Sequence, residues 1–493
     1  MSTDESGTMR PRSGYRADTV ATEAQRAPEG TKVRLAGRIV LWRRMGGLIF
    51  GQLQDRSGRV QVSLSGMDLG PEVIKEWSKS VKIGDFVGVA GSTYTTRKGE
   101  PTVAVSELVV LNRAVRSMPD KWLGMSNVDA RYRRRYLDLL VNTESRERFQ
   151  TRARIIRRIR RFLDENDFLE VETPILQESA SGAAARPFVT RHNALGEDFY
   201  LRISPETYLK RVTGGSLERV YELGRNFRNE GMDSSHLQEF TMLEWYAAYW
   251  DYRDNMTFIR ELLRAVMDDV FGTRKVKCGD VELDFGAEWP ELDYREEVAK
   301  HTGIDLTVVR DFATIGERVA ELGLDVEGVV SYAGLVDLLY KKTVRPQLVQ
   351  PCYLVHHPAE LVPLARRSDD DPTRLDMFQV VVNGWEIVKA YSELVDPVEQ
   401  RKRLEEQAEL RAAGDDETMM LEEDFIEAME YGMPPMSGLG LGIDRFVALL
   451  TNASTLREVV LFPSMRSVSG KSSVQVDDDD TNDLSAADDD SAE

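Results

Sequence analysis

The sequence predicts an α+β protein in which a small N-terminal β-barrel precedes a larger domain, whose mostly antiparallel sheet is flanked by helices. Three features predict this fold class. Short alternating strands and glycine turns fill residues 30–115, a charged hairpin spans residues 221–246, and a glycine-spaced apolar strand runs into a helix at residues 434–450. With about 150 residues per domain as a guide, the 493 residues allow two to four domains.

The barrel is predicted from a β-meander. Apolar and polar residues alternate over residues 33–41, and glycine-containing turns at residues 46–47 and 55–58 separate the first three strands. Two further strands are predicted near residues 85–92 and 102–111. Five strands are what a small OB-type barrel needs. Barrels of this type bind single-stranded nucleic acid through aromatic side chains and hydrogen bonds, and a purely structural barrel is the alternative.

The larger domain begins with an amphipathic helix followed by a strand that ends near Pro174. The apolar residues of this helix recur at helical spacing and form one stripe, which consists of Ile155, Ile156, Ile159, Phe162 and Leu163. Such a stripe alone predicts only a helix packed on a core. The arginine-rich stretch over residues 131–161 is predicted to be mostly a solvated helix face.

The hairpin at residues 221–246 is the most informative element. Arg228 and Glu230 stand at the end of its first strand, while Phe240, Glu244 and Tyr246 share one face of the second, because alternate residues of a strand point the same way. Buried charges are costly unless each meets a partner or a charged ligand. The hairpin is therefore predicted to form the floor of a site for a charged substrate, although an Arg-Asn-Glu segment on its own is typical of surface ion pairs.

The last element is a strand with glycines at 438, 440 and 442, followed by Asp444, Arg445 and a helical pattern. One face of this strand lacks side chains, so an adenine ring or a backbone can approach it closely. Between the hairpin and this strand, helical patterns at residues 313–322 and 332–340 predict a helical insertion.

Taken together, these motifs resemble the class II aminoacyl-tRNA synthetases. The helix and strand at residues 155–174 resemble motif 1, the hairpin with FRNE and His236 resembles motif 2, and PPMSGLGLGIDRFVALL resembles motif 3. A preceding OB-type barrel narrows the resemblance to the aspartyl, asparaginyl and lysyl enzymes. Over residues 15–466 the chain is most similar to the lysyl-tRNA synthetases of class II, with the strings DARYRRRYLDLL, ARPFVTRHNAL, RISPETYLKR and EDFIEAMEYGMPP.

The resemblance implies ATP-dependent ligation of L-lysine to its tRNA through a lysyl-adenylate, with Mg²⁺ as cofactor and a homodimer formed through motif 1. It implies catalytic roles for Arg228, Glu230 and Arg445. The implied ATP site consists of Arg228, Glu230, His236, Phe240, Glu386 and Arg445, and the implied metal ligands are Glu386 and Gln379. The implied anticodon-binding residues are Phe50, Gln61 and Glu107.

The implied lysine site consists of Gly182, Glu206, Glu244, Tyr246, Lys389, Tyr391 and Glu393. This set agrees with the chemistry of the substrate. An ε-ammonium that loses its water needs carboxylates and hydroxyls around it, and the α-carboxylate needs a cation. An aspartyl enzyme would instead want cations where these glutamates stand.

Five positions depart from the family pattern. Gln379 is a neutral amide where the family has a carboxylate, Lys389 stands where an asparagine is expected, Tyr391 replaces a phenylalanine, and Leu237-Gln238 replaces Asn-Pro. Our hypothesis is that the ammonium of Lys389 partly replaces a metal charge lost beside Gln379. Lineage drift in a working enzyme is the alternative.

Composition limits the remaining function classes. The net charge is -19, and nine acidic groups follow Lys471 in a segment with almost no apolar residues, which we predict to be a disordered tail. No long apolar run and no apolar signal core occur, so we predict a cytoplasmic protein without membrane contact. Only Cys278 and Cys352 occur, without metal-site spacing, which excludes a disulfide framework and a cysteine-rich zinc site.

The predicted organisation has five segments: a flexible N-terminal segment at 1–29, an OB-fold anticodon-binding domain at 30–115, a linker at 116–140, a class II catalytic domain at 141–466 with its helical insertion at about 270–350, and a disordered acidic tail at 467–493. Two other functions are open. One is a duplicated synthetase with altered amino-acid preference, which the changes at 379, 389 and 391 would permit. The other is a non-catalytic tRNA-binding protein, which the presence of Arg228, Glu230 and Arg445 disfavours.

Overall fold

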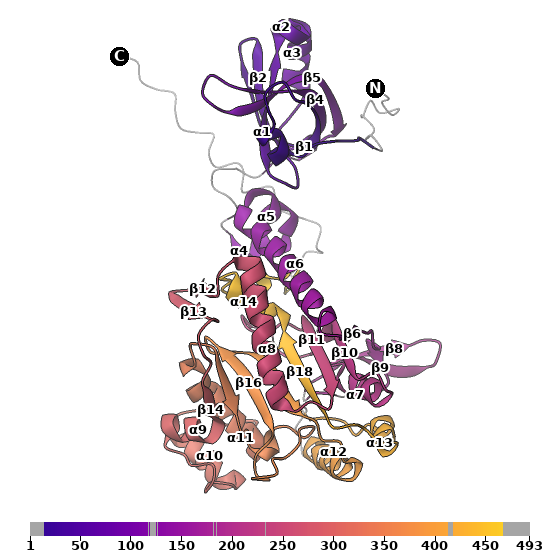
Figure 1. Cartoon of the computed structure of the whole chain (residues 1–493), viewed down its shortest axis with the longest axis vertical. Helices are drawn as coiled ribbons and strands as arrows, with labels where there is room; N and C mark the ends of the chain where they lie inside the picture. Colours follow the sequence, from indigo (N-terminus) through magenta and orange to yellow (C-terminus); the bar gives the residue numbers. More distant parts are fainter. Residues whose placement is uncertain are drawn as a thin grey trace. The chain divides into compact units, whose positions relative to one another are not determined.

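We describe the fold from a computed structural model. The structure describes residues 14–116, 118, 125, 127–180, 182–183, 185–231, 233–412 and 418–466. The chain divides into two compact units, Met1–Ser126 and Asn127–Glu493, each of which is described by itself (Figure 1). The predicted acidic tail lies outside the described residues.

The first unit contains the predicted five-stranded barrel. Its strands close in the order β1-β2-β3-β5-β4, and β3 and β5 run parallel while the other pairs are antiparallel. The alternation in the sequence buries one side of each strand, so that Leu35, Ile39 and Val62 are fully buried. The strands and the helices between β3 and β4 are β1 (Lys32–Met45), β2 (Leu48–Gln54), β3 (Arg59–Ser65), α2 (Gly66–Leu69), α3 (Pro71–Ser80), β4 (Phe86–Thr95) and β5 (Pro101–Asn112).

The prediction of a flexible segment at residues 1–29 is wrong for its second half. Helix α1 (Ala21–Arg26) buries Ala21 and Ala24 in the barrel core, and the Ala21 backbone N–H donates to Asp55 at 2.7 Å. The helix is too short for a periodic pattern to show. Small alanines that fit against the barrel carry the contact instead, and residues 1–13 lie outside the described part.

The second unit is built on an eight-stranded sheet in the order β14-β15-β16-β17-β18-β11-β10-β6. Only β14 with β15 and β10 with β6 are parallel, which confirms the predicted antiparallel character. The strands of this sheet are β6 (Leu169–Glu170), β10 (Arg219–Phe227), β11 (Glu239–Ala248), β14 (Glu291–Asp293), β15 (Cys352–Val355), β16 (Met377–Val382), β17 (Trp385–Ser392) and β18 (Met436–Gly442). A small separate sheet contains β7 (Leu176–Gln177), β8 (Phe188–His192) and β9 (Glu197–Leu201).

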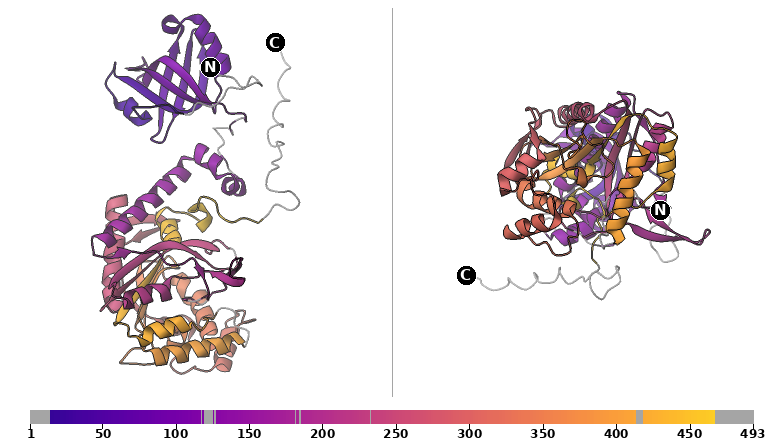
Figure 2. Two further views of the ribbon diagram at one scale, coloured as in Figure 1. Left: turned by 90° about the vertical axis from the view of Figure 1, so that its right-hand side faces the viewer. Right: turned by 90° about the horizontal axis from the view of Figure 1, so that it is seen from below.

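Helices α6 (Thr143–Asp164), α8 (Tyr252–Val266) and α14 (Ile443–Leu450) cover one face of the large sheet, and the other face carries the site together with α7 (Glu206–Gly214), which packs against β10 and β11. The predicted stripe on α6 is confirmed, because Ile155, Ile159, Phe162 and Leu163 join the main core together with residues of α8 and α14. On the other side of the unit, α12 (Pro397–Ala412) and α13 (Glu423–Glu430) lie side by side (Figure 2).

The predicted insertion is helical only in its later part. Residues 275–284 form a hairpin of β12 (Lys275–Cys278) and β13 (Val281–Asp284), whose apolar side chains pack against the main core. The helices α9 (Tyr294–Thr302), α10 (Phe312–Glu321) and α11 (Tyr332–Leu339) follow. They share a second core that includes Tyr340, Cys352 and Leu354.

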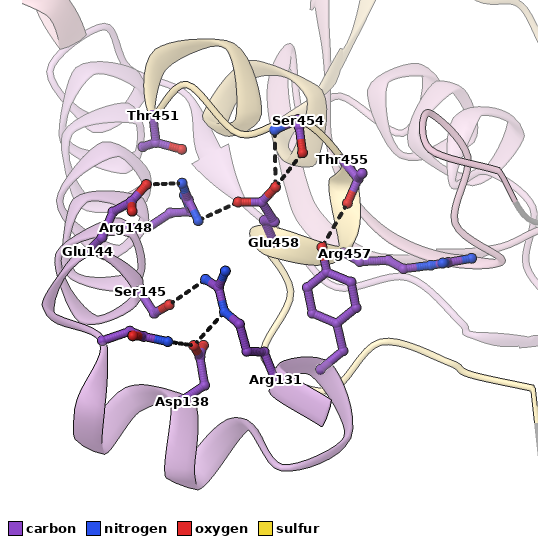
Figure 3. A network of polar contacts seen from close by, with 12 residues as sticks. Arg131, Asp138, Glu144, Ser145, Arg148, Thr451, Ser454, Thr455, Arg457 and Glu458 are labelled. Carbon is purple, nitrogen blue, oxygen red and sulfur yellow. Dashed lines mark hydrogen bonds and ion pairs between the residues drawn. The ribbon is translucent and has the colours of Figure 1, made fainter. Parts of the chain in front are cut away.

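Residues 127–140, predicted to lie in a linker, form helices of the second unit. Helices α4 (Val128–Arg133) and α5 (Arg135–Val141) are held by a polar network (Figure 3). Asp138, which is fully buried, accepts hydrogen bonds from Arg131 at 2.8 Å and Arg135 at 2.7 Å. Arg131 also donates to Ser145 on α6, so Arg131 and Arg135 hold the helices together, whereas Arg133 is exposed as predicted for most of this stretch.

The same network reaches the end of the second unit. Arg148 of α6 forms an ion pair with Glu458 at 2.6 Å, and Glu458 accepts a hydrogen bond from the Ser454 hydroxyl (Figure 3). The Tyr132 and Thr455 hydroxyls lie 3.3 Å apart. The segment after α14 is thereby fixed against α4 and α6.

Candidate functional site

A cavity of about 840 Å³ opens on the exposed face of the large sheet, between the sheet and the helical insertion. Its floor follows from the alternation along β11. Leu243, Trp245 and Ala247 enter the main core, whereas Glu244 and Tyr246 face the cavity. The residues predicted for the ATP, lysine and metal sites that line it are Gly182, Glu206, Arg228, Glu230, His236, Phe240, Glu244, Tyr246, Gln379, Glu386, Lys389, Tyr391 and Arg445.

Arg228 and Phe240 lie together at one end of this floor. Strand β10 ends one residue before Arg228, but the ladder continues because the Arg228 backbone N–H donates to the Gln238 carbonyl at 2.9 Å. The guanidinium carbon of Arg228 lies 5.1 Å from the centre of the Phe240 ring. Such a cation–π contact fixes the arginine without neutralising it, so its charge is left for an anionic ligand.

His236 connects the hairpin loop with the helix that follows the glycine strand. Its Nδ1 lies 2.9 Å from the Asp233 carboxylate and its Nε2 lies 3.2 Å from the Arg445 guanidinium. Although burial works against it, hydrogen bonds from His236 and Ser235 hold the pKa of Asp233 at about 2. Arg445 also donates to the Glu386 carbonyl at 2.9 Å, so two elements orient its charge.

The helix that carries the segment resembling motif 1 meets the other two motifs at Arg152, three residues before that segment. This arginine of α6 forms an ion pair with Asp444 at 2.6 Å and donates to the Thr241 hydroxyl at 3.0 Å. Asp444 also accepts the Thr241 backbone N–H at 2.8 Å. One arginine thus links the helix α6, the hairpin and the turn into α14.

The glycines of β18 make room for side chains of the neighbouring strands. A Cβ on Gly438 would lie 2.2 Å from the Tyr246 ring and 2.5 Å from the Glu393 carboxylate, and one on Gly440 would lie 2.6 Å from the Met242 methyl. Gly438, Gly440 and Gly442 all line the cavity. At Gly438 and Gly440 the space is occupied by side chains of the neighbouring strands, and the predicted approach of an adenine ring stays a prediction.

The far end of the floor carries buried acid groups. Glu244 is 3% exposed, and its carboxylate accepts hydrogen bonds from the Ser204 hydroxyl at 2.8 Å and the Tyr246 hydroxyl at 3.4 Å. Burial, together with the negative charge of Glu206, raises the pKa of Glu244 to about 8. Binding of a cationic ligand to such a buried acid is favourable, because the positive charge of the ligand stabilises the ionised carboxylate that burial disfavours.

Glu206 and Glu393 are joined by a lysine that the sequence analysis did not single out. Lys210 is 1% exposed and forms ion pairs with Glu206 at 2.7 Å and with Glu393. The Tyr391 hydroxyl donates to Glu206 at 2.6 Å. Glu393 is the one predicted lysine-site residue that is not among the lining residues, because Lys210 holds its carboxylate beneath the floor.

The predicted metal pair forms a hydrogen bond in place of two parallel carboxylates. The Gln379 amide donates to the Glu386 carboxylate at 2.6 Å, and its oxygen accepts from the Tyr340 hydroxyl at 3.3 Å. Tyr340 therefore turns the amide so that its N–H groups face Glu386. Among the described residues no group of three or more His, Cys, Asp or Glu side chains is placed to hold a metal.

Lys389 lies directly opposite Gln379 in the register of β16 and β17 and lines the cavity. Within the described part of the chain its ammonium has no carboxylate within ion-pair distance. Its positive charge also contributes to lowering the pKa of His357, a buried imidazole whose pKa falls to about 3 mainly through burial. This end of the cavity therefore holds a cation and a neutral histidine beside Glu386.

The predicted anticodon residues lie on the barrel. Phe50 and Gln61 occupy neighbouring strands on the side that faces away from the core, and Gln61 donates to the Thr102 hydroxyl at 2.8 Å. Glu107 is exposed on β5, the strand that pairs with β3 next to Gln61. The three side chains are thus accessible on adjacent strands.

Several residues of the site carry no sequence motif of their own. Ser204, Lys210, Asp233, Arg152 and His357 were not predicted, although each contacts or orients a predicted residue. Lys210 follows Glu206 by four residues, which is a local signal for an ion pair once the segment is known to be the helix α7. Asp233 lies only three residues before His236, in a loop without periodic pattern, whereas Ser204 and Arg152 meet their partners across long stretches of chain.

Comparison with protein families agrees with the two units. Residues 127–466 match the family model described as tRNA synthetases class II (D, K and N), and residues 33–111 match the model described as OB-fold nucleic acid binding domain. The first match begins where α4 begins. It therefore includes the helices that the sequence analysis placed in a linker.

The chain is also similar to curated proteins over most of its length. It is 46% identical to a lysine–tRNA ligase of Pelotomaculum thermopropionicum over 440 residues, covering 89% of this chain and 87% of the relative. It is 45% identical to the enzyme of Chloroflexus aurantiacus, covering 92% and 93%, and 43% identical to that of Aquifex aeolicus, covering 89% and 74%. Within the described residues, no helix combines the length and apolar character required to cross a membrane.

Proposed function

Because this chain belongs to the class II tRNA synthetases of the D, K and N group, we infer that it ligates L-lysine to tRNA through a lysyl-adenylate at the expense of ATP. The observation that carries the choice of lysine is the floor of buried carboxylates, Glu206 and Glu244, at one end of a cavity whose other end presents Arg228. Carboxylates suit the two ammonium groups of lysine, and the arginine suits its carboxylate and the phosphates of ATP.

The first step needs no nucleophile from the protein. The lysine carboxylate oxygen attacks the α-phosphorus of ATP, a new O–P bond forms, and the bond to the pyrophosphate oxygen breaks. Pyrophosphate leaves and lysyl-adenylate remains. Arg228 next to Phe240 is placed for the α-phosphate, and Arg445, held by His236 and the Glu386 carbonyl, is placed for the outer phosphates. Catalysis then consists of positioning and of charge that is already in place.

In the second step the terminal hydroxyl of the tRNA attacks the carbonyl carbon of lysyl-adenylate. The mixed-anhydride bond breaks, AMP leaves, and the proton of the hydroxyl goes to the departing phosphate. We assign the anticodon contact to Phe50, Gln61 and Glu107, whose accessible positions on the barrel suit stacking and hydrogen bonding to unpaired bases. A cytoplasmic location remains a prediction.

Magnesium fits this site through one carboxylate. Mg²⁺ usually binds through one or two carboxylates together with substrate phosphates and water. Glu386 meets this requirement, whereas Gln379 presents its N–H groups toward Glu386 and not a ligand oxygen. When bound with ATP, the ion would add positive charge at the phosphates.

We also propose that Lys389 supplies part of the positive charge beside the magnesium site. Lys389 lies opposite Gln379, has no ion pair among the described residues, and would supply charge where a second carboxylate-bound ion is disfavoured. Lys389→Asn should therefore need several-fold more Mg²⁺ for half-maximal pyrophosphate exchange, while Gln379→Glu should need less. Equal magnesium demand in the wild type and in Lys389→Asn would refute this role. Lys341→Asn, which changes an exposed lysine paired with Asp337 at the rim of the cavity, serves as the control.

We also propose a homodimer that forms through motif 1. Exposed apolar side chains gather on the segments that follow α6, where soluble monomers rarely keep contiguous apolar surface. Leu169 is 50% exposed, Ile175 45% and Leu176 49%. A second copy of the chain would cover them.

Lysine-dependent exchange of pyrophosphate into ATP tests the function directly. The wild-type protein should exchange with lysine in the absence of tRNA and should then charge lysine tRNA. A chain with altered amino-acid preference would exchange with a lysine analogue instead, and a non-catalytic tRNA-binding protein would show no exchange.

A further inference from the structure

Lys210 is a buried cation that the proposed reaction does not use. It lies on α7 (Glu206–Gly214), its side chain is 1% exposed, and its ammonium is bound by Glu206 from its own helix and by Glu393 at the end of β17. The rings of Tyr391 and Phe425 lie 5.6 and 5.8 Å from the ammonium nitrogen. Two carboxylates and two aromatic faces therefore enclose it.

The position of Lys210 separates it from the substrate space. It does not line the cavity, whereas Glu206, Glu244 and Tyr391 do. Its two carboxylate partners hold it from opposite sides, and the Tyr391 hydroxyl donates to the same Glu206 oxygen that the lysine binds. A ligand in the cavity can thus reach Glu206 while Lys210 stays beneath the floor.

The charges of the side chains around Lys210 indicate what this lysine contributes to the pocket. When ionised, the buried carboxylates of Glu206, Glu244 and Glu393 carry three negative charges, and Lys210 reduces this sum to minus two, while the charges of Arg202 and Arg228 favour the ionised form of Glu244. Free lysine brings two ammonium groups to this end of the cavity. The pocket with Lys210 is therefore charge-matched to the substrate, and the pocket without it carries one uncompensated carboxylate, which is costly in a buried site.

We propose that Lys210 is a positioning residue that keeps Glu206 and Glu393 ionised and fixed, and so sets the charge of the amino-acid pocket to match a dication. This inference rests on the proposed lysine ligation. The groups that face Lys210 and its partners are Glu206 on α7, Tyr391 and Glu393 on β17 and the segment after it, and Glu244 and Tyr246 on β11.

Removing the charge of Lys210 and removing the charge of Glu393 should shift the pH dependence of lysine binding in opposite directions. Without Lys210, mutual repulsion favours protonation of the carboxylates, so that lysine binds well only at higher pH. Without the charge of Glu393, Lys210 pairs with Glu206 alone and the repulsion among the carboxylates falls. The remaining carboxylates then stay ionised at lower pH, so that substrate lysine binds well there. Burial raises the pKa of Glu393 and the charge of Lys210 opposes this rise, so the pH dependence of lysine binding should respond to the loss of either residue.

The experiment is pyrophosphate exchange at pH 6.5 to 9 with the full-length chain, with KM measured for lysine and for ATP. Lys210→Met should raise the KM for lysine at pH 7 by roughly tenfold or more, as expected for the loss of a charged buried partner. The pH of the lowest KM should move upward, while the KM for ATP stays within about twofold. Lys210→Arg, which keeps the charge, should retain the wild-type pH profile. Lys300→Met is the matched control, because Lys300 is an exposed lysine paired with Glu297.

Glu393→Gln keeps the test decisive if Lys210→Met fails to fold. This variant should raise the KM for lysine and move its pH dependence downward. In the double variant the two effects should couple, because each residue acts through the other. Unchanged pH profiles in Lys210→Met and Glu393→Gln, or equal effects on the KM for lysine and for ATP, would overturn the inference. Absence of lysine-dependent exchange in the wild type would instead overturn the proposed function.

Discussion

At the scale of single residues, the site is governed by where charge is buried. Glu244 keeps its place through hydrogen bonds from Ser204 and Tyr246, yet burial still raises its pKa to about 8. Arg228 is held by the ring of Phe240 and not by a carboxylate. One end of the cavity therefore carries buried negative charge, and the other end carries positive charge that no carboxylate of the described residues neutralises. A bound lysine would neutralise the first and a bound nucleotide the second.

Glu244→Gln tests the acid end. The substitution should raise the KM for lysine by about tenfold to a hundredfold, the cost of losing a charged hydrogen bond. The wild-type KM for lysine should fall as pH rises toward 8, because an ammonium ligand binds the ionised carboxylate, and Glu244→Gln should lose this dependence. Pyrophosphate-exchange kinetics at pH 6.5 to 8.5 measure both effects.

The same raised pKa has a consequence for stability. An acid whose folded pKa lies above its unfolded value stabilises the fold less as pH rises from about 4.5 to 8, so Glu244→Gln should not be less stable than the wild type at pH 8. Glu239→Gln on the same strand is the control, because Glu239 is exposed and pairs only with Arg225 at 3.6 Å. A marked loss of stability in Glu244→Gln at pH 8 would contradict the view that burial disfavours the ionised form of Glu244.

Sequence patterns predicted the floor of the site but not what lies beneath it. Alternation along one strand was enough to place Phe240, Glu244 and Tyr246 on a common face. Lys210 meets Glu393 across 183 residues of chain, and no local pattern reports such a contact. The same limit explains why Glu393 was expected at the surface of the cavity.

At the scale of elements, a few buried polar residues hold the helices of the second unit together. Arg152 joins α6, the hairpin and the turn into α14 through Asp444 and Thr241, and Asp138 joins α4, α5 and α6. Burial alone would raise the pKa of Asp138, but hydrogen bonds from Asn142, Arg135 and Arg131 outweigh it and lower that pKa below its ordinary value.

Asp138→Asn should therefore destabilise the second unit by about 3 kcal/mol at pH 7, because it leaves the fully buried Arg135 without its counter-ion. A carboxylate with a lowered folded pKa contributes its stability above the ordinary value of 3.8 and loses it as pH falls below that value. The difference between the variant and the wild type should accordingly shrink between pH 5 and pH 3. Urea unfolding across this range measures it.

Asp129→Asn is the matched control for this network. Asp129 forms an exposed ion pair with Arg133 on the same helix, so its loss should cost less than about 1 kcal/mol. Equal costs for Asp129→Asn and Asp138→Asn would show that the buried network does not hold these helices.

Most elements of the second unit followed from periodicity, and the exceptions have physical causes. The stripe on α6, the helices near residues 313–322 and 332–340, and the motif 2 hairpin are present as predicted. Helices α4 and α5 are short and rich in arginine, and their buried faces are polar, so composition indicated a linker. Helix α1 is held by two alanines, which give no periodic signal.

At the scale of the whole molecule, the proposed tRNA contacts lie on the barrel and the proposed activation site lies in the second unit. The first unit presents accessible side chains on a closed barrel, and the second contains the cavity with all residues proposed for amino-acid activation. Activation should therefore be independent of the barrel surface, whereas charging of tRNA should depend on it.

Phe50→Ala tests this division. Loss of a stacking platform costs roughly 1–3 kcal/mol per base, so the kcat/KM for aminoacylation of lysine tRNA should fall by about tenfold or more. Lysine-dependent exchange without tRNA should stay at the wild-type rate. Phe86→Ala, which removes another partly exposed ring of the same barrel, stacked on Arg38, should leave both activities intact. Equal aminoacylation by Phe50→Ala and the wild type would refute the proposed anticodon contact.

The proposed dimer is tested at the exposed apolar segment after α6. Leu176→Asp should convert the protein from a dimer to a monomer in sedimentation velocity, because a charge would be buried without a partner in the interface. Val308→Asp, at a 76% exposed valine of the insertion, should leave the dimer unchanged. A wild-type protein that sediments as a monomer at micromolar concentration would contradict the proposal.

The central claim is that this cavity activates lysine. The most direct measurement is ATP–pyrophosphate exchange with magnesium, without tRNA, across lysine, close lysine analogues, aspartate and asparagine. The account predicts exchange with lysine at the lowest KM, little or none with aspartate and asparagine, and subsequent charging of lysine tRNA. Exchange with aspartate or asparagine in place of lysine, or no exchange with any amino acid, would contradict it.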